Sequence, residues 1–264
     1  MSVDAGFPAV RRSTCAVGYA TIHPTEFAKA QRADAFEIMG TGFMVGPLRR
    51  VLTCAHVVQA LESVARKRGG RPTYGPAFQF VQPAFGGAGW ISSLRGGRVL
   101  ESNETTDVAL LELPDPPPDL VSIPITANAS APEVGEEIGV CGYAHGSALL
   151  RKGKEIGRFG PVLQRGIVAA QSPYDNAMAE IVLLDLIAGP AASGSPVFRI
   201  ATGEVCGVLF EGQINRSAAF SAARLMHVDA AGELVIRWNR ARPVALPGPA
   251  PSAHNSAQSN KIAE

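Results

Sequence analysis

A serine in a loop of small residues is the first feature of this sequence that could do chemistry. The segment GPAASGSPVF, at 189–198, follows an apolar run at 181–187 and places Ser193 among small side chains between Pro190 and Pro196. Small neighbours let a substrate carbonyl approach the hydroxyl, and they let backbone N–H groups point at the same oxygen. The segment is equally typical of a surface turn, because Gly, Pro and Ser favour turns for backbone reasons. It indicates a nucleophile only if a base and an orienting carboxylate occur elsewhere.

A histidine and an aspartate upstream fit these two roles. His56 follows the apolar run VLTCA at 51–55, and Asp107 precedes the strand-like run VALLEL at 108–113. Imidazole has an unperturbed pKa of about 6.5, so His56 could take the proton of Ser193 as a general base. Asp107 would fix the tautomer of His56 and stabilise the imidazolium. The three catalytic candidates therefore occur in the order His56, Asp107, Ser193.

The segments around these residues resemble the chymotrypsin-fold serine peptidases. The similar blocks are GTGFMV at 40–45, LTCAHVV at 52–58, DVALL at 107–111 and SGSP at 193–196. The segments VGEEIGVCGY at 134–143 and RGIV at 165–168 resemble the bacterial, HtrA-like branch in particular. The resemblance implies a trypsin-like peptidase domain, and the sequence leaves no room for the PDZ domain that HtrA-like proteases often carry. It also implies a serine endopeptidase that works through an acyl-enzyme.

The resemblance implies the remaining parts of the site as well. The backbone N–H groups of Ala191 and Ser193 would form the oxyanion hole, although the family usually has glycine at the position of Ala191. An extended polypeptide substrate would add as a strand beside the run at 207–212. The residues expected to contact it are Ile187, Leu209, Phe210, Glu211 and Gly212. Ile187 stands where a basic-specific member carries an aspartate, which favours small or medium apolar side chains before the cleaved bond.

Ala191 leads to a structural prediction of its own. Glycine often serves where φ must be positive, and an alanine Cβ there adds about 1 kcal/mol or more. We expect the peptide bond before Ala191 to be flipped at rest and to turn inward with substrate; the alternative is a productive loop with φ below zero. Ala191 also keeps a second function open, a catalytically weak or inactive protease fold used as a binding or sensing module. An esterase of another fold is disfavoured, because its G-x-S-x-G elbow is missing.

Many short apolar runs between Gly and Pro residues predict an all-β fold. The resemblance implies two six-stranded antiparallel β-barrels with a short helix after His56, and a first strand is expected at 9–20. The proline run at 114–118 cannot be central strand, so it is the expected link between the halves. We expect a peptidase domain at 1–240, with halves at about 9–113 and 121–240. The Pro-, Ala- and Ser-rich segment 241–264 is predicted to be a disordered tail.

Composition limits the partners. The 264 residues carry a net charge of +1, which gives no bulk attraction to nucleic acid. No apolar stretch approaches about 18 residues, so no membrane span is predicted, and residues 1–20 lack a secretory signal pattern. The four cysteines, Cys15, Cys54, Cys141 and Cys206, are expected to be free buried thiols in a reducing, cytoplasmic compartment. No cofactor or metal is predicted; a polypeptide substrate is the expected partner, and the oligomeric state is left open.

Overall fold

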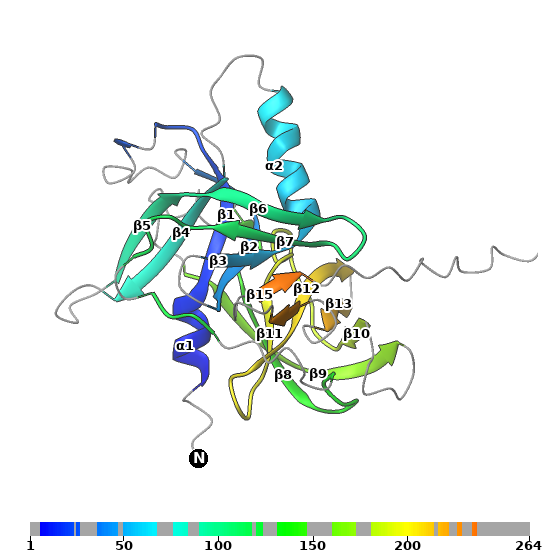
Figure 1. Cartoon of the computed structure of the whole chain (residues 1–264). Helices are drawn as coiled ribbons and strands as arrows, with labels where there is room; N and C mark the ends of the chain where they lie inside the picture. The colour runs from blue at the N-terminus through cyan, green and yellow to red at the C-terminus, as the bar shows by residue number, and fades with distance from the viewer. Residues whose placement is uncertain are drawn as a thin grey trace, which may run out of the picture.

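The protein is described by a computed structural model, which covers residues 6–23, 25–26, 36–46, 50–67, 76–83, 90–117, 120–123, 131–146, 160–172, 181–213, 216–221, 226–228 and 234–236. Within these residues the chain is mostly β-structure, with two curled antiparallel sheets and two short α-helices (Figure 1). The predicted all-β class and double-barrel architecture are confirmed. The segment 241–264, predicted to be a disordered tail, lies outside the described residues.

The first sheet closes on itself at a glycine. Its strand order is β5-β4-β1-β2-β3-β7-β6, with bounds β1 (Thr14–Ala20), β2 (Phe36–Val45), β3 (Arg50–Thr53), β4 (Pro76–Pro83), β5 (Trp90–Gly96), β6 (Arg98–Asn103) and β7 (Val108–Glu112). The two edge strands, β5 and β6, are separated only by Gly97, so they form one bent strand that pairs with β4 and with β7. A Cβ at Gly97 would lie 2.5 Å from the Glu112 carbonyl oxygen, so a larger residue does not fit at this bend. Counted with β5–β6 as one strand, this is the expected six-stranded barrel.

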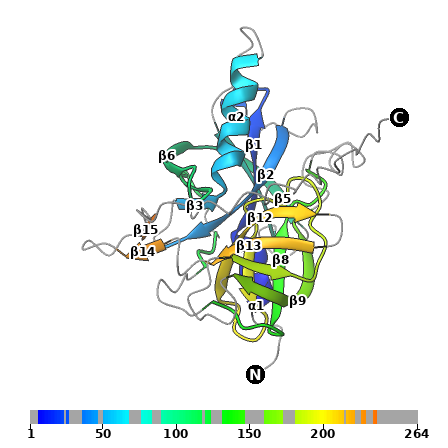
Figure 2. The same ribbon diagram turned by 90° about the vertical axis from the view of Figure 1, so that its right-hand side faces the viewer.

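The second sheet is a closed barrel with the order β10-β13-β12-β11-β8-β9. Its strands are β8 (Glu137–Gly142), β9 (Val162–Ser172), β10 (Ile181–Leu184), β11 (Pro196–Arg199), β12 (Val205–Gln213) and β13 (Arg216–Ser221). A separate hairpin follows, formed by β14 (Met226–Val228) and β15 (Leu234–Ile236). The view in Figure 2 shows this barrel below the first sheet, with the helix after β3 on the opposite side.

The main hydrophobic core joins the two barrels. It contains Phe43, Leu52 and Leu110 from the first sheet together with Phe198 and Val208 from the second. Each of these side chains is at most 1% exposed, and full burial of a side chain of this kind stabilises by about 1.5–3 kcal/mol. The second barrel also has an apolar cluster of its own, to which β8, β10 and β12 each contribute two residues. The halves therefore pack as one unit, which lets residues from both contribute to one site.

Helix α1 (Gly6–Ser13) corrects the expectation of a strand starting at residue 9; the strand β1 begins only at Thr14. The helix buries Val10 completely, and the Val10 carbonyl accepts hydrogen bonds from the hydroxyls of Ser13 and Thr14 at its end. Arg11 and Arg12 lie in the last turn, where cations suit the helix dipole. The predicted strand at 9–20 included this helix because the helix is only two turns long and β1 follows it without a gap.

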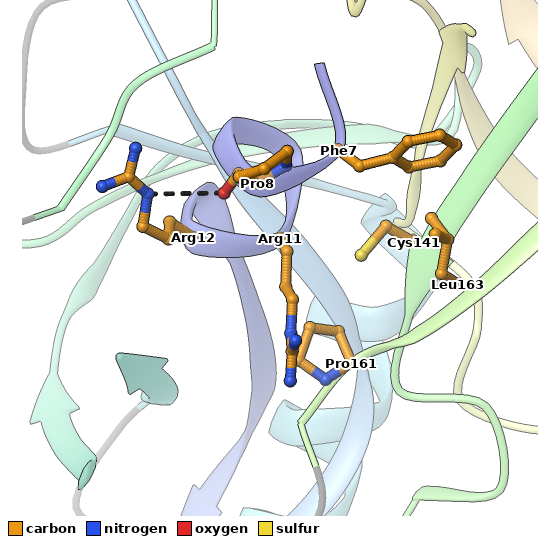
Figure 3. Close-up of a pocket in the computed structure, with 7 residues that line it drawn as sticks. All are labelled: Phe7, Pro8, Arg11, Arg12, Cys141, Pro161 and Leu163. Atoms are coloured by element: carbon orange, nitrogen blue, oxygen red, sulfur yellow. Dashed lines mark hydrogen bonds between the residues drawn. The ribbon is translucent and has the colours of Figure 1, made fainter. Parts of the chain in front are cut away.

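A cavity of about 760 Å³ lies beside α1, lined by Phe7, Pro8, Arg11, Arg12, Cys141, Pro161 and Leu163 (Figure 3). In the close-up, Phe7, Cys141 and Leu163 form one apolar wall, and Arg12 reaches back to the Pro8 carbonyl on the other side of the helix. None of the residues predicted to act on a substrate lines this cavity. Neither α1 nor α2 (Ala55–Lys67) has the length and apolar character of a membrane-crossing helix.

Candidate active site

His56 and Asp107 meet at the ends of two paired strands. His56 lies in the first turn of α2, directly after β3, and Asp107 lies in the turn before β7. Because β3 and β7 pair with Thr53 opposite Ala109, the two residues come together at one end of the ladder. Asp107 Oδ2 is 2.7 Å from His56 Nδ1, and Asp107 Oδ1 accepts the backbone N–H of His56 at 2.9 Å. Both carboxylate oxygens therefore hold the histidine.

The contact with Asp107 determines which tautomer the neutral His56 ring adopts. An ionised carboxylate only accepts hydrogen bonds, so the neutral His56 ring must carry its proton on Nδ1, which leaves Nε2 as an acceptor. A third hydrogen bond, from the Ala55 N–H to the Asp107 carbonyl at 3.1 Å, holds the backbone of the pair. The His56 side chain is 44% exposed and that of Asp107 only 21%, so the ring faces solvent over a more sheltered carboxylate. The arrangement suits a base with one fixed tautomer.

Ser193 lies in the loop between β10 and β11, and residues 189–195 are called the serine loop below. The loop and the start of α2 both approach Gly40 of β2: a Cβ on Gly40 would lie 2.6 Å from Val57 Cγ2 and 3.1 Å from the Ser193 carbonyl oxygen. The Ser193 hydroxyl donates to the Phe210 carbonyl at 3.2 Å, and among the described residues it makes no hydrogen bond to His56. Catalytic hydrogen bonds are often long or misaligned before substrate binds, so this rotamer is compatible with a nucleophile.

Backbone strain gathers around the same residues. In the described part of the chain, the non-glycine residues with positive φ are Asp107 at 50°, His145 at 70° and Ala191 at 67°. Aspartate and histidine tolerate the left-handed region better than most residues, whereas alanine gains nothing there from its side chain. Such outliers persist only where surrounding contacts over-determine them, and they concentrate at functional sites.

The structure supports neither of the two alternatives stated for Ala191. Its φ of 67° is left-handed, so the alternative of φ below zero is wrong. The Pro190 carbonyl accepts the His145 N–H at 2.8 Å, whereas a flipped peptide would turn that carbonyl toward the serine side. This bond argues against the flipped resting state that the sequence favoured. The N–H groups of Ala191 and Ser193 have no acceptor within the described structure, which leaves both able to donate to a ligand.

Cys54 lies behind the histidine–aspartate pair. Ligand atoms of Cys54, His56 and Asp107 all lie within 4.8 Å of one another, a combination that could hold a metal ion. However, burial and the charge of Asp107 raise the pKa of the Cys54 thiol well above its usual range. Its Sγ donates to the Leu209 carbonyl at 3.3 Å, and the imidazole Nδ1 is already bonded to the carboxylate. Hydrogen bonds within the protein therefore account for the close approach of Cys54, His56 and Asp107 without a metal ion.

The residues expected to bind substrate divide into two groups. Ile187 is 59% exposed and Phe210 is partly buried against the main core, so both side chains are at least partly accessible. Leu209 is 1% exposed, its N–H donates to Ser195, and its carbonyl accepts from Gly194, so neither its side chain nor its backbone is available. We therefore leave Leu209 out of the proposed substrate site.

The strand that carries the remaining candidates has an open edge. Strand β11 pairs with β12 only through Val205, Gly207 and Val208. Glu211 and Gly212 lie farther along β12 and pair with β13 on the other side. No strand among the described ones pairs with the second edge of β12 at these two residues.

Residues 40–208 match the family model of the trypsin-like peptidase domain, which is more than half of the chain. The chain belongs to the trypsin-like peptidase family. The resemblance inferred from the motifs is thereby confirmed, and the fold is that of HtrA- and Deg-type serine proteases. No curated protein matches the sequence.

Solved structures of this peptidase fold resemble the chain at low sequence identity. Deg5 is 16% identical, with a TM-score of 0.54, over 80% of this chain and 85% of that one. The serine endoprotease from Yersinia pestis is 17% identical, with a TM-score of 0.53, over 84% of this chain and 63% of that one. The MamO protease domain from Magnetospirillum magneticum is 14% identical, with a TM-score of 0.54, over 81% and 93% of the two chains. Identities this low establish the fold alone.

Two residues at the site were not assigned a role from the sequence. His145 donates its N–H to the serine loop, and Thr41 bonds to that loop through its hydroxyl. Thr41 lies in the GTGFMV block that indicated the family. That block does not predict a hydrogen bond to Ala191, which is 150 residues away in the chain.

Proposed function

We propose that this peptidase domain is a serine endopeptidase in which Ser193 is the nucleophile, His56 the general base and Asp107 the residue that orients His56. The observation that carries the proposal is the pair of contacts between Asp107 and His56. One carboxylate oxygen lies 2.7 Å from Nδ1, and the other accepts the backbone N–H. A carboxylate in this position fixes the tautomer and stabilises the imidazolium that forms during proton transfer. Membership of the trypsin-like peptidase family supports the same reaction.

The reaction proceeds in two halves. Ser193 Oγ rotates from the Phe210 carbonyl toward His56 Nε2, gives up its proton there and attacks the substrate carbonyl carbon. The resulting oxyanion accepts hydrogen bonds from the N–H groups of Ala191 and Ser193. Protonated His56 then returns the proton to the leaving amine, and the C–N bond breaks to give an acyl-enzyme. Water repeats the attack with His56 as its base, which releases the acid and restores the Ser193 hydroxyl.

Substrate recognition follows from the open edge of β12. An extended polypeptide can pair with that edge beside Glu211 and Gly212, because β11 stops pairing at Val208. Exposed Ile187 and partly buried Phe210 would then meet the side chain before the cleaved bond, which favours small or medium apolar residues. Profiling with a peptide library tests this preference. Strict cleavage after Arg or Lys would refute it.

The second candidate function is a weak or inactive protease fold that binds polypeptides without cleaving them. Its supporting observation is the rotamer of Ser193, whose hydroxyl bonds to Phe210 rather than to His56. Under this alternative the same open strand edge would bind a peptide, but the serine would not become acylated.

Covalent labelling separates the two functions. A fluorophosphonate probe should label the wild type and the Ser122→Ala control, whose serine hydroxyl bonds to the Gly46 carbonyl away from the site. Ser193→Ala should not be labelled. Peptide binding without labelling or hydrolysis in the wild type would favour the binding module.

We also propose the domain limits 1–240, with halves at about 9–113 and 121–240. Leu113, Leu120 and Ile123, which flank the proline run, are all buried in the main core. The Ile123 N–H bonds to the Met44 carbonyl of the first sheet, so the link runs along that barrel. A chain of residues 1–240 should retain the activity and unfolding midpoint of the full chain; a large loss of either would contradict these limits.

A further inference from the structure

Thr41 bonds to both barrels from a fully buried position. It lies in β2 of the first sheet with 0% exposure. Its hydroxyl donates to the Ala191 carbonyl at 2.9 Å and accepts the Tyr143 N–H at 2.9 Å. Its N–H donates to the Ser193 carbonyl at 2.8 Å, and its carbonyl accepts the Thr53 hydroxyl at 2.6 Å. Three of these four bonds reach the second half of the chain.

The hydroxyl completes a set of bonds that fixes the strained residue of the serine loop. The peptide between Ala191 and Ala192 is held at its carbonyl by this hydroxyl and at its N–H by the Gly189 carbonyl, at 3.1 Å. The preceding peptide is held by the bond from His145 to Pro190. Because each peptide is planar, two fixed planes determine the backbone of Ala191. They hold it at a φ of 67°, which is unfavourable for alanine by itself.

We propose that Thr41 is a positioning residue, whose hydroxyl holds the serine loop in the shape that presents the Ala191 and Ser193 N–H groups to the oxyanion. This inference rests on the proposed function. Thr41 touches no reacting atom; it acts through the carbonyls of Ala191 and Ser193. The first barrel, which supplies His56 and Asp107, thus also shapes the loop of the second barrel that supplies the nucleophile.

The test compares substitutions that keep or remove the hydroxyl. Thr41→Val has nearly the same shape but cannot donate to Ala191. We expect kcat to fall by about 10–10²-fold with KM within about 3-fold, because the oxyanion contact forms in the transition state. Thr41→Ser keeps the donor and should stay within about 3-fold of the wild type.

A matched control separates positioning from general packing. Thr14 is also buried, and its hydroxyl donates to the Val10 carbonyl in α1 at 2.8 Å. Thr14→Val should change the unfolding midpoint but leave kcat unaltered. An equal fall of kcat in both variants, or a Thr41→Ser enzyme as slow as Thr41→Val, would overturn the proposal. If Thr41→Val does not fold, Thr41→Ala takes its place in the same comparison.

Relief of strain gives a second readout. Glycine adopts positive φ without a steric penalty, so it should hold the loop shape with fewer supporting bonds. Adding Ala191→Gly to Thr41→Val should recover at least about 5-fold of the lost kcat. No recovery in the folded double variant would contradict a role that acts through the conformation of Ala191.

Failure of the proposed function has a different signature. In that case the wild type neither hydrolyses peptides nor reacts with the fluorophosphonate probe. The role of Thr41 is then decided by crystal structures of the wild type and Thr41→Val. A left-handed Ala191 in the wild type that is lost in Thr41→Val supports the inference, and an unchanged serine loop overturns it.

Discussion

The two halves of the site are built in opposite ways. On the first barrel, His56 and Asp107 lie at the ends of paired strands and are joined by two hydrogen bonds, with a third at their backbone. On the second barrel, Ser193 lies in a loop whose Ala191 is strained and whose hydroxyl points to a carbonyl. The proposed base is positioned by regular structure, whereas the proposed nucleophile depends on contacts that come from elsewhere. The activity of such a site should therefore also depend on residues that only hold the serine loop in place.

The two strained residues, Asp107 and Ala191, are stabilised in different ways. Asp107 also has positive φ, but its own side chain and backbone bond to His56 and Ala55 of the same barrel, which supports the turn. The methyl group of Ala191 cannot form a hydrogen bond, so the backbone of Ala191 is held by bonds from Thr41 and His145. A site assembled across two barrels can thus be weakened without altering any residue that touches substrate.

Removing either reacting group should have the largest effect. Ser193→Ala and His56→Ala should each lower peptide hydrolysis by about 10⁴-fold or more while the fold is retained. Initial rates with a cleaved peptide, together with circular dichroism spectra, measure both. Unchanged turnover in Ser193→Ala would reject the proposed nucleophile.

Asp107→Asn tests the contact between the Asp107 carboxylate and His56 Nδ1. The amide can no longer act as an ionised acceptor for Nδ1–H, so we expect kcat to fall by about 10³–10⁴-fold. Asp115→Asn is a suitable control, because Asp115 is 88% exposed and lies 3.5 Å from Arg95 in a surface ion pair. The control should remain within about 2-fold of the wild type. A mild effect of Asp107→Asn would show that the helix alone orients His56.

Much of the fold and the three catalytic candidates could be predicted from the sequence. The strand at Phe36–Val45 was bounded by Gly46, and the histidine, aspartate and serine each stood beside an apolar run, so local pattern was enough to identify them. The helix α1 was missed because it is short and leads directly into β1. The roles of Thr41 and His145 could not be predicted, since they depend on contacts between distant segments. The left-handed Ala191 is stable only through those contacts, which no local propensity encodes.

The buried thiols test whether the two barrels unfold as one unit. Burial raises the pKa of Cys141 and of Cys206 to about 12, from an ordinary value of 9.0. Above pH 9 the unfolded chain loses these protons while the folded chain keeps them. Stability should therefore be unaffected below about pH 9 and decline toward pH 12, by up to about 1.4 kcal/mol per pH unit and thiol.

Thermal unfolding at pH 8, 9 and 10 measures this decline, and Cys206→Ala should make it shallower. The shared core that joins the barrels also predicts a common opening. Cys54 of the first barrel and Cys206 of the second should then react with an alkylating reagent at the same slow rate. Faster labelling of one of them would show that the barrels open separately.

The smallest effect is expected for Ala191→Gly alone. Glycine would remove the steric penalty of a φ near 67°, about 1 kcal/mol, but it would also loosen the unfolded chain by a similar amount. Because Thr41, His145 and Gly189 already hold both adjoining peptides, the serine loop has little to gain in shape. We expect kcat on short peptides to stay within about 3-fold of the wild type and the unfolding midpoint to shift little. Steady-state kinetics on short and long peptides measure this directly. A gain of about tenfold or more on short peptides would mean that the loop spends most of its time away from the left-handed shape, and that the bonds around Ala191 form only when substrate is bound.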